Sequence, residues 1–164
     1  MNTKALIHTL FLRFAVFTII GLVAALMASL TLVSVVHAAE TDSPVGLWTT
    51  IDDTTGKPRG QVRIYEQSGK LYGKLEKSFQ PGADSRGCTK CTDERKNNAI
   101  IGLILIRNMV RHGDEYEGGD ILDPESGSVY RCKLVLEDGG KKLKVRGFIG
   151  VSLLGRTQVW ERAE

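Results

Sequence analysis

The chain has 164 residues, which is enough for one ordinary domain but leaves no room for a second. Two of its 22 basic residues, Lys4 and Arg13, lie ahead of or at the start of a long apolar segment, which leaves 20 basic against 19 acidic residues and a net charge of +1 for the rest. These charges are scattered along the chain, so the basicity of the whole sequence gives no support for nucleic-acid binding.

Residues 1–38 have the pattern of a secretory signal peptide. Lys4 and Arg13 form a basic n-region, residues 14–36 are uncharged and mostly apolar, and Val36-His37-Ala38 fits the −3 to −1 positions of a signal-peptidase site. The apolar stretch is also long enough to serve as an uncleaved anchor. Because the basic residues precede it, both alternatives place the C-terminal part outside the cytoplasm. We expect a periplasmic or secreted protein that meets the membrane only through residues 14–36, if these are not removed.

After a short polar lead at residues 39–45, alternating apolar and polar residues form brief runs separated by turn residues. Alternation with a period of two predicts β-strands, and Ser68-Gly69-Lys70 and Glu137-Asp138-Gly139-Gly140 predict tight turns between them. Hairpins at this spacing indicate an all-β sandwich or barrel. The clearest predicted strands are 46–51, 61–66, 71–75, 129–136, 143–148 and 156–162.

Two segments are less regular. Residues 80–98 form one long polar loop, and residues 99–109 form an apolar run whose β-branched isoleucines and Gly102 favour a buried strand over a helix. The total is about eight strands, and a closed eight-stranded barrel has an interior just wide enough for side chains or one small ligand. The predicted fold is therefore a single antiparallel up-and-down β-barrel over residues 46–164.

The two ends of this predicted barrel share a pattern with calycins. Gly46-Leu47-Trp48 opens the first strand, as Gly-x-Trp does in lipocalins, and Trp160 and Arg162 lie on the last strand, where calycins commonly place a basic residue across that tryptophan. A guanidinium can stack on the face of a buried indole. We expect Trp48, Trp160 and Arg162 to close one end of the barrel.

The chain from Gly46 to Arg162 resembles an uncharacterised family of exported bacterial proteins, domain-of-unknown-function family 2147. The resemblance implies a calycin-like, lipocalin-like barrel and supplies no activity. Besides the first-strand motif, it rests on Gly56-Lys57-Pro58, Cys88 with Cys91, Gly102-Leu103, residues 118–124, Tyr130, and the tail from Gly147 to Trp160.

Cys88-Thr89-Lys90-Cys91 favours a disulfide, because an even pair outside the cytoplasm is typically oxidised. A thioredoxin-type redox pair would need a helix start after it, but a charged stretch follows. A zinc site would have to recruit Cys132 and His112. Cys132 lies mid-strand among apolar residues and fits better as a small buried side chain.

Residues suited to catalysis are few. His112, the one histidine after residue 38, lies in a predicted turn, and the sequence holds neither a nucleophile elbow nor a phosphate-binding loop. Neighbouring acids such as Asp52-Asp53 and Asp93-Glu94 also fall in predicted turns, where solvated charge is expected. We expect no catalytic residues, no metal and no cofactor.

Arg156, Thr157 and Gln158 open the last strand, at a barrel mouth if the sheet closes as predicted. They suit the anionic head group of a ligand, although an arginine that bonds loop carbonyls is an alternative.

Two functions from different classes remain open. The first is a non-enzymatic barrel that binds a small apolar or amphipathic molecule of the cell envelope. The second is a structural or interaction protein whose barrel is filled by its own side chains and whose surface meets an envelope protein; an enzyme has the least support. The positions expected to face inward are Val62, Ile64, Leu71, Leu75, Leu134, Leu136, Leu143 and Val145.

Overall fold

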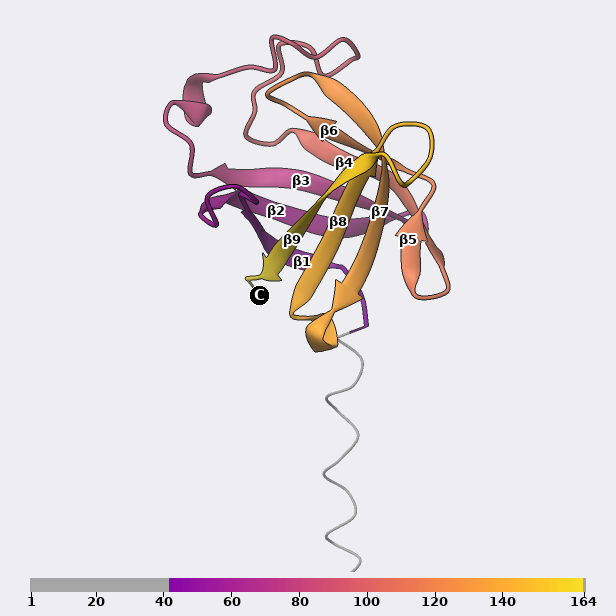
Figure 1. The fold of residues 1–164 in the computed structure, drawn as a ribbon. Coiled ribbons are helices and arrows are strands. Elements are labelled where there is room, and N and C mark those ends of the chain that lie inside the picture. The colour runs from indigo at the N-terminus through magenta and orange to yellow at the C-terminus, as the bar shows by residue number, and fades with distance from the viewer. Residues whose placement is uncertain (1–41, 164) are drawn as a thin grey trace, which may run out of the picture. The chain divides into compact units, whose positions relative to one another are not determined.

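The computed structural model describes residues 42–163, and Figure 1 shows their fold. Two short 3-10 turns, η1 (Ala83–Ser85) and η2 (Asp138–Gly140), are the only helical segments in this range, so no helix there is long and apolar enough to cross a membrane. The strands are β1 (Gly46–Ile51), β2 (Pro58–Gln67), β3 (Lys70–Ser78), β4 (Ile104–His112), β5 (Glu115–Glu117), β6 (Asp120–Asp123), β7 (Ser128–Glu137), β8 (Lys142–Phe148) and β9 (Gly155–Arg162).

The strands form one antiparallel sheet that closes on itself. Its order is β3-β2-β1-β9-β8-β7-β5-β4-β6, and the further pairings of β3 with β4 and of β6 with β7 complete the ring. The short strands β5 and β6 together occupy one strand position between β4 and β7, because Gly118-Gly119 interrupts what would otherwise be a single strand. Eight positions therefore surround the barrel, which confirms the predicted all-β barrel of about eight strands.

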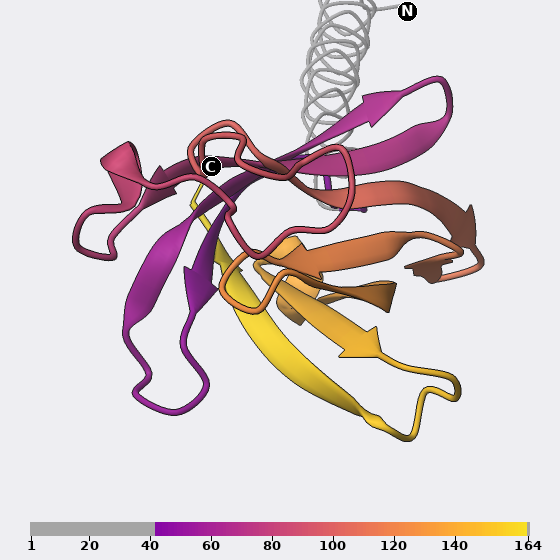
Figure 2. The ribbon, with the colours of Figure 1, turned by 90° about the horizontal axis from the view of Figure 1, so that it is seen from above.

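Successive strands run up and down, so the loops fall into two sets. One end carries the tight turns at 68–69, 113–114 and 138–141. The other carries the longer loops 52–57, 79–103, 124–127 and 149–154, which we call the mouth loops. Figure 2 looks down on the end of the barrel over which loop 79–103 lies.

Apolar side chains at alternate strand positions fill the barrel. Trp48, Val62, Ile106, Leu134 and Leu143 are each fully buried there. Burial of a side chain of this size stabilises the fold by roughly 1.5–3 kcal/mol. Of the eight positions expected to face inward, seven are buried and Leu136 is partly buried against the same cluster.

The apolar run at residues 99–109 is only partly a strand. β4 begins at Ile104, and residues 99–103 form a turn instead, because Gly102 adopts a left-handed backbone with φ +89°. Ile100 and Leu103 are nevertheless buried, so this apolar stretch anchors the loop that precedes β4 to the core.

The predicted turn at residues 68–70 is a two-residue turn in which Ser68 and Gly69 both have positive φ, as a type I′ hairpin requires.

Arg162 closes the end of the barrel opposite the mouth loops. It pairs with Trp48 across the β1–β9 ladder, and its guanidinium lies 4.3 Å from the centroid of the buried Trp48 ring. The same side chain donates hydrogen bonds to the carbonyl oxygens of Gly140 (2.6 Å), Val45 (3.0 Å) and Ser43 (2.8 Å). The indole N–H of Trp48 donates to the carbonyl of Pro44 at 2.7 Å. First strand, last strand, η2 turn and N-terminal lead thus meet at one guanidinium.

The predicted signal segment at residues 1–38 and the first part of the lead lie outside the described residues.

The Arg162–Trp48 contact predicts a measurable coupling in stability. We expect Trp48→Ala to lower the free energy of unfolding by about 3–5 kcal/mol through the cavity it leaves, and Arg162→Ala by about 2–3 kcal/mol. Denaturant unfolding of both single variants and the double variant should give an interaction energy of about 1 kcal/mol or more.

Arg111→Ala serves as the control, because this arginine lies over the Tyr116 ring at 5.9 Å but is half exposed. It should cost less than about 1 kcal/mol. If the effects of Trp48→Ala and Arg162→Ala simply add, the two side chains do not stabilise each other and the closure described above is wrong.

Candidate ligand-binding site

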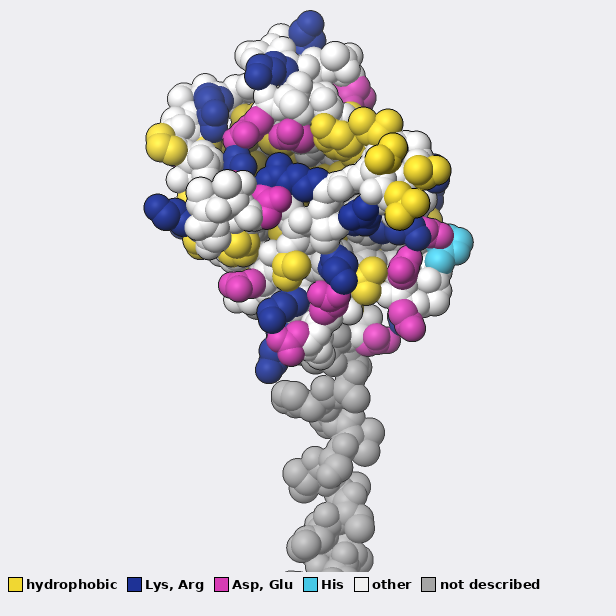
Figure 3. Space-filling view, viewed as in Figure 1, with side chains coloured by type: hydrophobic (Ala, Val, Ile, Leu, Met, Phe, Trp, Pro, Cys, Tyr) yellow, Lys and Arg dark blue, Asp and Glu magenta, His cyan; other side chains and the backbone are white. Residues whose placement is uncertain are grey.

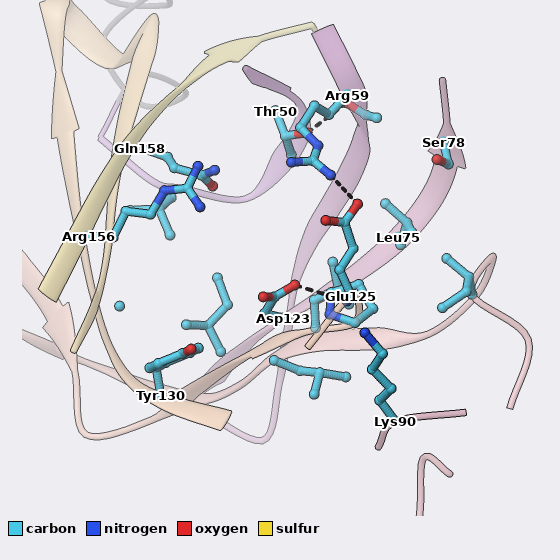
Figure 4. Close-up of a pocket in the computed structure, with 18 of the residues that line it drawn as sticks. Thr50, Arg59, Leu75, Ser78, Lys90, Asp123, Glu125, Tyr130, Arg156 and Gln158 are labelled. Carbon is cyan, nitrogen blue, oxygen red and sulfur yellow. Dashed lines mark hydrogen bonds and ion pairs between the residues drawn. The ribbon is translucent and has the colours of Figure 1, made fainter. Parts of the chain in front are cut away.

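The mouth end of the barrel contains a cavity of about 640 Å³. This size lies within the range of about 300–1,000 Å³ that is typical of small-molecule sites. Figure 4 shows side chains from strands and mouth loops directed toward the same space. The lining residues labelled there are Thr50, Arg59, Leu75, Ser78, Lys90, Asp123, Glu125, Tyr130, Arg156 and Gln158.

The floor of the cavity is apolar. Trp160 is 2 % exposed, and Leu105, Leu122 and Val145 are also buried beside it. The indole N–H of Trp160 donates to Oε1 of Gln158 at 3.2 Å, so its polar group is satisfied within β9. An apolar ligand group would therefore meet no unpaired donor from this tryptophan on the floor.

Gly147 provides part of the open space. It follows Leu143 and Val145 at alternate positions on the inner face of β8, where a side chain would otherwise project into the barrel. A Cβ atom built here would lie 3.4 Å from Ile121 and 3.5 Å from Tyr130, which are ordinary van der Waals contacts. The site can thus accommodate a larger residue only by giving up cavity volume.

Ion pairs order part of the lip. Arg59 donates to Asp52 at 3.1 Å and also pairs with Glu125 on the loop between β6 and β7. Arg156 pairs with Asp53 on the loop between β1 and β2, and its hydrogen bond lowers the pKa of that carboxyl. These pairs tie neighbouring mouth loops to the ends of β2 and β9.

The lip also carries positive charge without a partner carboxylate. Within residues 42–163 neither Arg86 nor Lys90 takes part in an ion pair, although both line the cavity. Four cationic side chains line the cavity, against the two carboxylates Asp123 and Glu125. Asp123 already accepts hydrogen bonds from the backbone N–H of Glu125 and the hydroxyl of Ser126. Arg86 and Lys90 are therefore the two lip cations without a carboxylate partner, and they can pair with an anionic group of a ligand.

The three predicted mouth residues do not lie on the same face of β9. Arg156 and Gln158 line the cavity. Thr157 lies on the outer face, where its hydroxyl accepts a hydrogen bond from Arg146 at 2.7 Å. Three consecutive strand residues cannot share a face, because side chains alternate. Trp160, expected at the closure, instead forms the cavity floor one step nearer the mouth than Arg162.

A disulfide loop forms one wall of the mouth. Cys88 and Cys91 are bonded, with their Cα atoms 5.4 Å apart, which confirms the predicted bridge. Both side chains are buried in the main core cluster, and the backbone N–H of Cys88 donates to the carbonyl of Asn98 at 2.9 Å. The third cysteine, Cys132, is reduced and buried, and its burial raises the pKa of the thiol.

Two further contacts hold this loop in place. The buried Arg95 donates to Asp93 and to the carbonyl of Ile104 at 3.0 Å, and this guanidinium lowers the pKa of Asp93 to about 2. Gly127, with φ +75°, packs so closely that a Cβ there would lie 2.0 Å from the carbonyl oxygen of Lys90. The disulfide loop is therefore docked on the turn between β6 and β7 and holds Lys90 at the cavity.

The arrangement suits non-covalent binding. His112 ends β4 beside the turn at the closed end of the barrel, and it does not line the cavity. No group of three or more metal-ligating side chains occurs in the part of the chain that the structure describes. Besides the carboxylates Asp123 and Glu125, the polar groups at the mouth are cations, amides and hydroxyls that can orient an anionic group.

The sequence interpretation missed several lining residues. The structure brings Arg59 from the start of β2, Arg86 and Lys90 from loop 79–103, and Tyr130 from β7 to the mouth, and only the closed barrel brings these segments together. Gly147 carried a usable signal, because a glycine in phase with Leu143 and Val145 marks an inward position without a side chain.

Comparisons with known proteins bear on the fold. The family model described as "Uncharacterized protein conserved in bacteria (DUF2147)" matches residues 46–162. No curated protein matches the chain. A solved structure, protein HP1028 from the human pathogen Helicobacter pylori, is described as belonging to the lipocalin family. It aligns with a TM-score of 0.64 at 17 % identity, over 74 % of this chain and 84 % of that one. At this identity the likeness establishes a shared lipocalin-like fold.

The cysteine arrangement predicts the thiol content of the folded protein. Because Cys88 and Cys91 are bonded and Cys132 is buried with a raised pKa, we expect no thiol to react with a water-soluble reagent until the protein is denatured. One thiol per chain should then appear. Two or three reactive thiols in the native protein would contradict the described disulfide.

Proposed function

The chain belongs to the bacterial family DUF2147, and from its lipocalin-like barrel with a cavity at one end we propose that it binds one small amphipathic molecule with an anionic head group. The observation that carries this proposal is the combination of an apolar floor with unpaired cations at the lip. Val145 and Trp160 would contact the apolar part of the ligand, and Arg86 and Lys90 would face its charge.

The volume supports a ligand over a filled barrel. The half of the barrel next to Arg162 is packed by large side chains such as Trp48 and Leu143, whereas the mouth half retains about 640 Å³. A barrel that served only as a scaffold would gain stability by filling that space, because buried apolar contacts favour folding. Gly147 leaves the space open although its backbone does not require glycine, because its φ is not in the left-handed region.

The charges favour an anion over a cation or a neutral head group. A cationic head would face Arg86, Lys90 and Arg156, whereas an anionic head would gain charge-assisted hydrogen bonds from them. Arg156 is already paired with Asp53, so Arg86 and Lys90 carry most of the discrimination. The Tyr130 hydroxyl and the Gln158 amide offer additional neutral partners at the same lip.

The predicted export signal and the disulfide support a site of action outside the cytoplasm. We propose that residues 1–38 direct export and are removed, so that the barrel works in the periplasm or outside the cell. The Cys88–Cys91 bond supports this, because disulfides persist in oxidising compartments. The intact mass of protein from the envelope fraction tests it: a chain that begins at Ala39 is expected, and one that begins at Met1 would indicate a retained anchor.

Binding of two probes of equal chain length tests the proposed function. We expect decanoate to bind more tightly than decan-1-ol in titration calorimetry, because only decanoate is charged at neutral pH. Replacing both lip cations, Arg86→Ala with Lys90→Ala, should weaken decanoate binding about tenfold and leave decan-1-ol binding unchanged.

Two further variants act as controls. Lys70→Ala with Lys141→Ala removes two positive charges, as the lip variant does, but from the closed end of the barrel. It should leave decanoate binding unchanged. Gly147→Leu should remove binding of both probes while the protein stays folded, because the new side chain enters the cavity. Undiminished binding by Gly147→Leu, or no binding of either probe to the unaltered protein, would overturn the proposal.

A further inference from the structure

The loop between β8 and β9 exposes an unusual group of apolar side chains. We define residues 149–154 as the apolar tip. Ile149 is 68 % exposed, Val151 62 %, Leu153 88 % and Leu154 72 %. No charged residue occurs between Gly147 and Gly155, the stretch that contains the tip. Figure 3 shows hydrophobic side chains gathered over this loop at the mouth end.

The carbonyl groups of the apolar tip are hydrogen-bonded inside the protein. Arg146 donates to the carbonyl oxygens of Ser152 and Leu153, and Arg131 donates to that of Gly150 at 3.4 Å. The N–H of Leu154 donates to Val151, and the N–H of Ile149 donates to Leu154. All five carbonyl oxygens from residue 150 to residue 154 therefore accept a hydrogen bond inside the protein.

The paired carbonyl groups lower the free-energy cost of moving the tip from water into a bilayer. An unpaired carbonyl costs several kcal/mol in a hydrocarbon environment, so loops rarely enter lipid unless their backbone groups are bonded internally. Here the carbonyls are already paired while the apolar side chains point outward. Among the described residues the N–H groups of residues 150–153 have no acceptor, so the tip suits the interfacial region of a bilayer, where water still reaches these groups, rather than its hydrocarbon centre.

Cations surround the base of the tip. Arg131 lies over the Phe148 ring at 5.5 Å, and Arg146 donates hydrogen bonds to the loop. Arg156 lies on β9, two residues after the last residue of the tip. Arg86 and Lys90 lie on the facing lip of the same cavity. An apolar tip with basic residues behind it matches the surface of a bilayer that contains anionic lipids.

A second copy of the chain fits less well. A specific protein interface uses about 20–30 residues on each side, whereas the tip offers six residues on a single turn. A bilayer needs no such area, because each inserted side chain contributes independently.

We propose that the apolar tip docks the mouth of the barrel onto an anionic lipid bilayer. Leu153 and Leu154 enter the interfacial region, and Arg131 and Arg146 lie near the lipid phosphates. The sequence predicts membrane contact only through residues 14–36, so the tip is a second contact. It does not depend on an occupied cavity, although docking in this orientation would bring the proposed ligand site to the bilayer surface.

A fluorescent label on the tip tests the proposal whatever holds the N-terminus. Because Cys88 and Cys91 are bonded and Cys132 is buried, Val151→Cys supplies the one accessible thiol of the described residues for an environment-sensitive dye. With vesicles of phosphatidylethanolamine and phosphatidylglycerol we expect a blue shift and quenching by lipids brominated on their acyl chains. The response should grow with the phosphatidylglycerol fraction and weaken with salt.

Matched variants assign the effect to the tip. Leu153→Thr with Leu154→Thr, added to the labelled chain, should lower vesicle partitioning of the label about tenfold or more. Val45→Thr with Val159→Thr removes exposed apolar groups elsewhere and should change little. A dye at Lys141→Cys, at the closed end, should not respond. Gly147→Leu should retain the tip response, which separates docking from ligand binding.

Two results would overturn the proposal. One is a tip label that shows no blue shift with vesicles. The other is a blue shift that depends on protein concentration without vesicles, which would mean that the tip binds a second copy of the chain.

Discussion

The stacking of Arg162 on Trp48 is the contact on which the rest of the structure depends. A sheet of this length stays open unless its first and last strands pair, and β1 and β9 share only two paired positions, Trp48 with Arg162 and Thr49 with Glu161. The backbone N–H of Ala163 adds one hydrogen bond to Leu47 at 2.8 Å. Because this ladder is short, side-chain contacts contribute a large share of its stability. One guanidinium donates hydrogen bonds to three carbonyl oxygens and covers an indole. These hydrogen bonds offset the free-energy cost of removing its charge from water.

Closing one end also determines what the other end can do. The pleat places Arg162, Trp160, Gln158 and Arg156 on one face of β9. The face therefore changes along the strand from a capping cation to an apolar floor, then to an amide and a second cation at the lip. The same direction on β8 leads from Leu143 and Val145 to Gly147, where the missing side chain opens the cavity. Strand alternation and one glycine thus convert a packed barrel into a container with a polar lip.

The local pattern of the sequence predicted most of the fold. Period-two alternation located six of the nine strands, and the Gly-x-Trp motif with Arg162 indicated which strands meet. β5 and β6 were missed because each is too short to show alternation. The extent of β4 was misjudged because an apolar run does not reveal the positive φ of Gly102.

The candidate site was harder to predict because it depends on closure. Arg156 and Gln158 could be placed at a mouth from their position on the last strand. Arg59 at the start of β2 and the loop that carries Arg86 and Lys90 lie far from that strand in the sequence. The ion pair of Arg156 with Asp53 joins residues more than a hundred positions apart, and no local pattern encodes it. No prediction was made from the sequence for the exposed apolar tip at residues 149–154. The exposure of its side chains and the hydrogen bonds from Arg131 and Arg146 to its carbonyls are visible only in the folded structure.

Native mass spectrometry of the protein purified from its own cell envelope tests the central claim most directly, namely that the cavity holds an anionic amphiphile. The account predicts that the folded chain retains a small non-covalent adduct, that the released molecule ionises as an anion, and that the Gly147→Leu variant purified in the same way lacks it. A chain that carries no adduct, or an adduct retained equally by Gly147→Leu, would contradict the account.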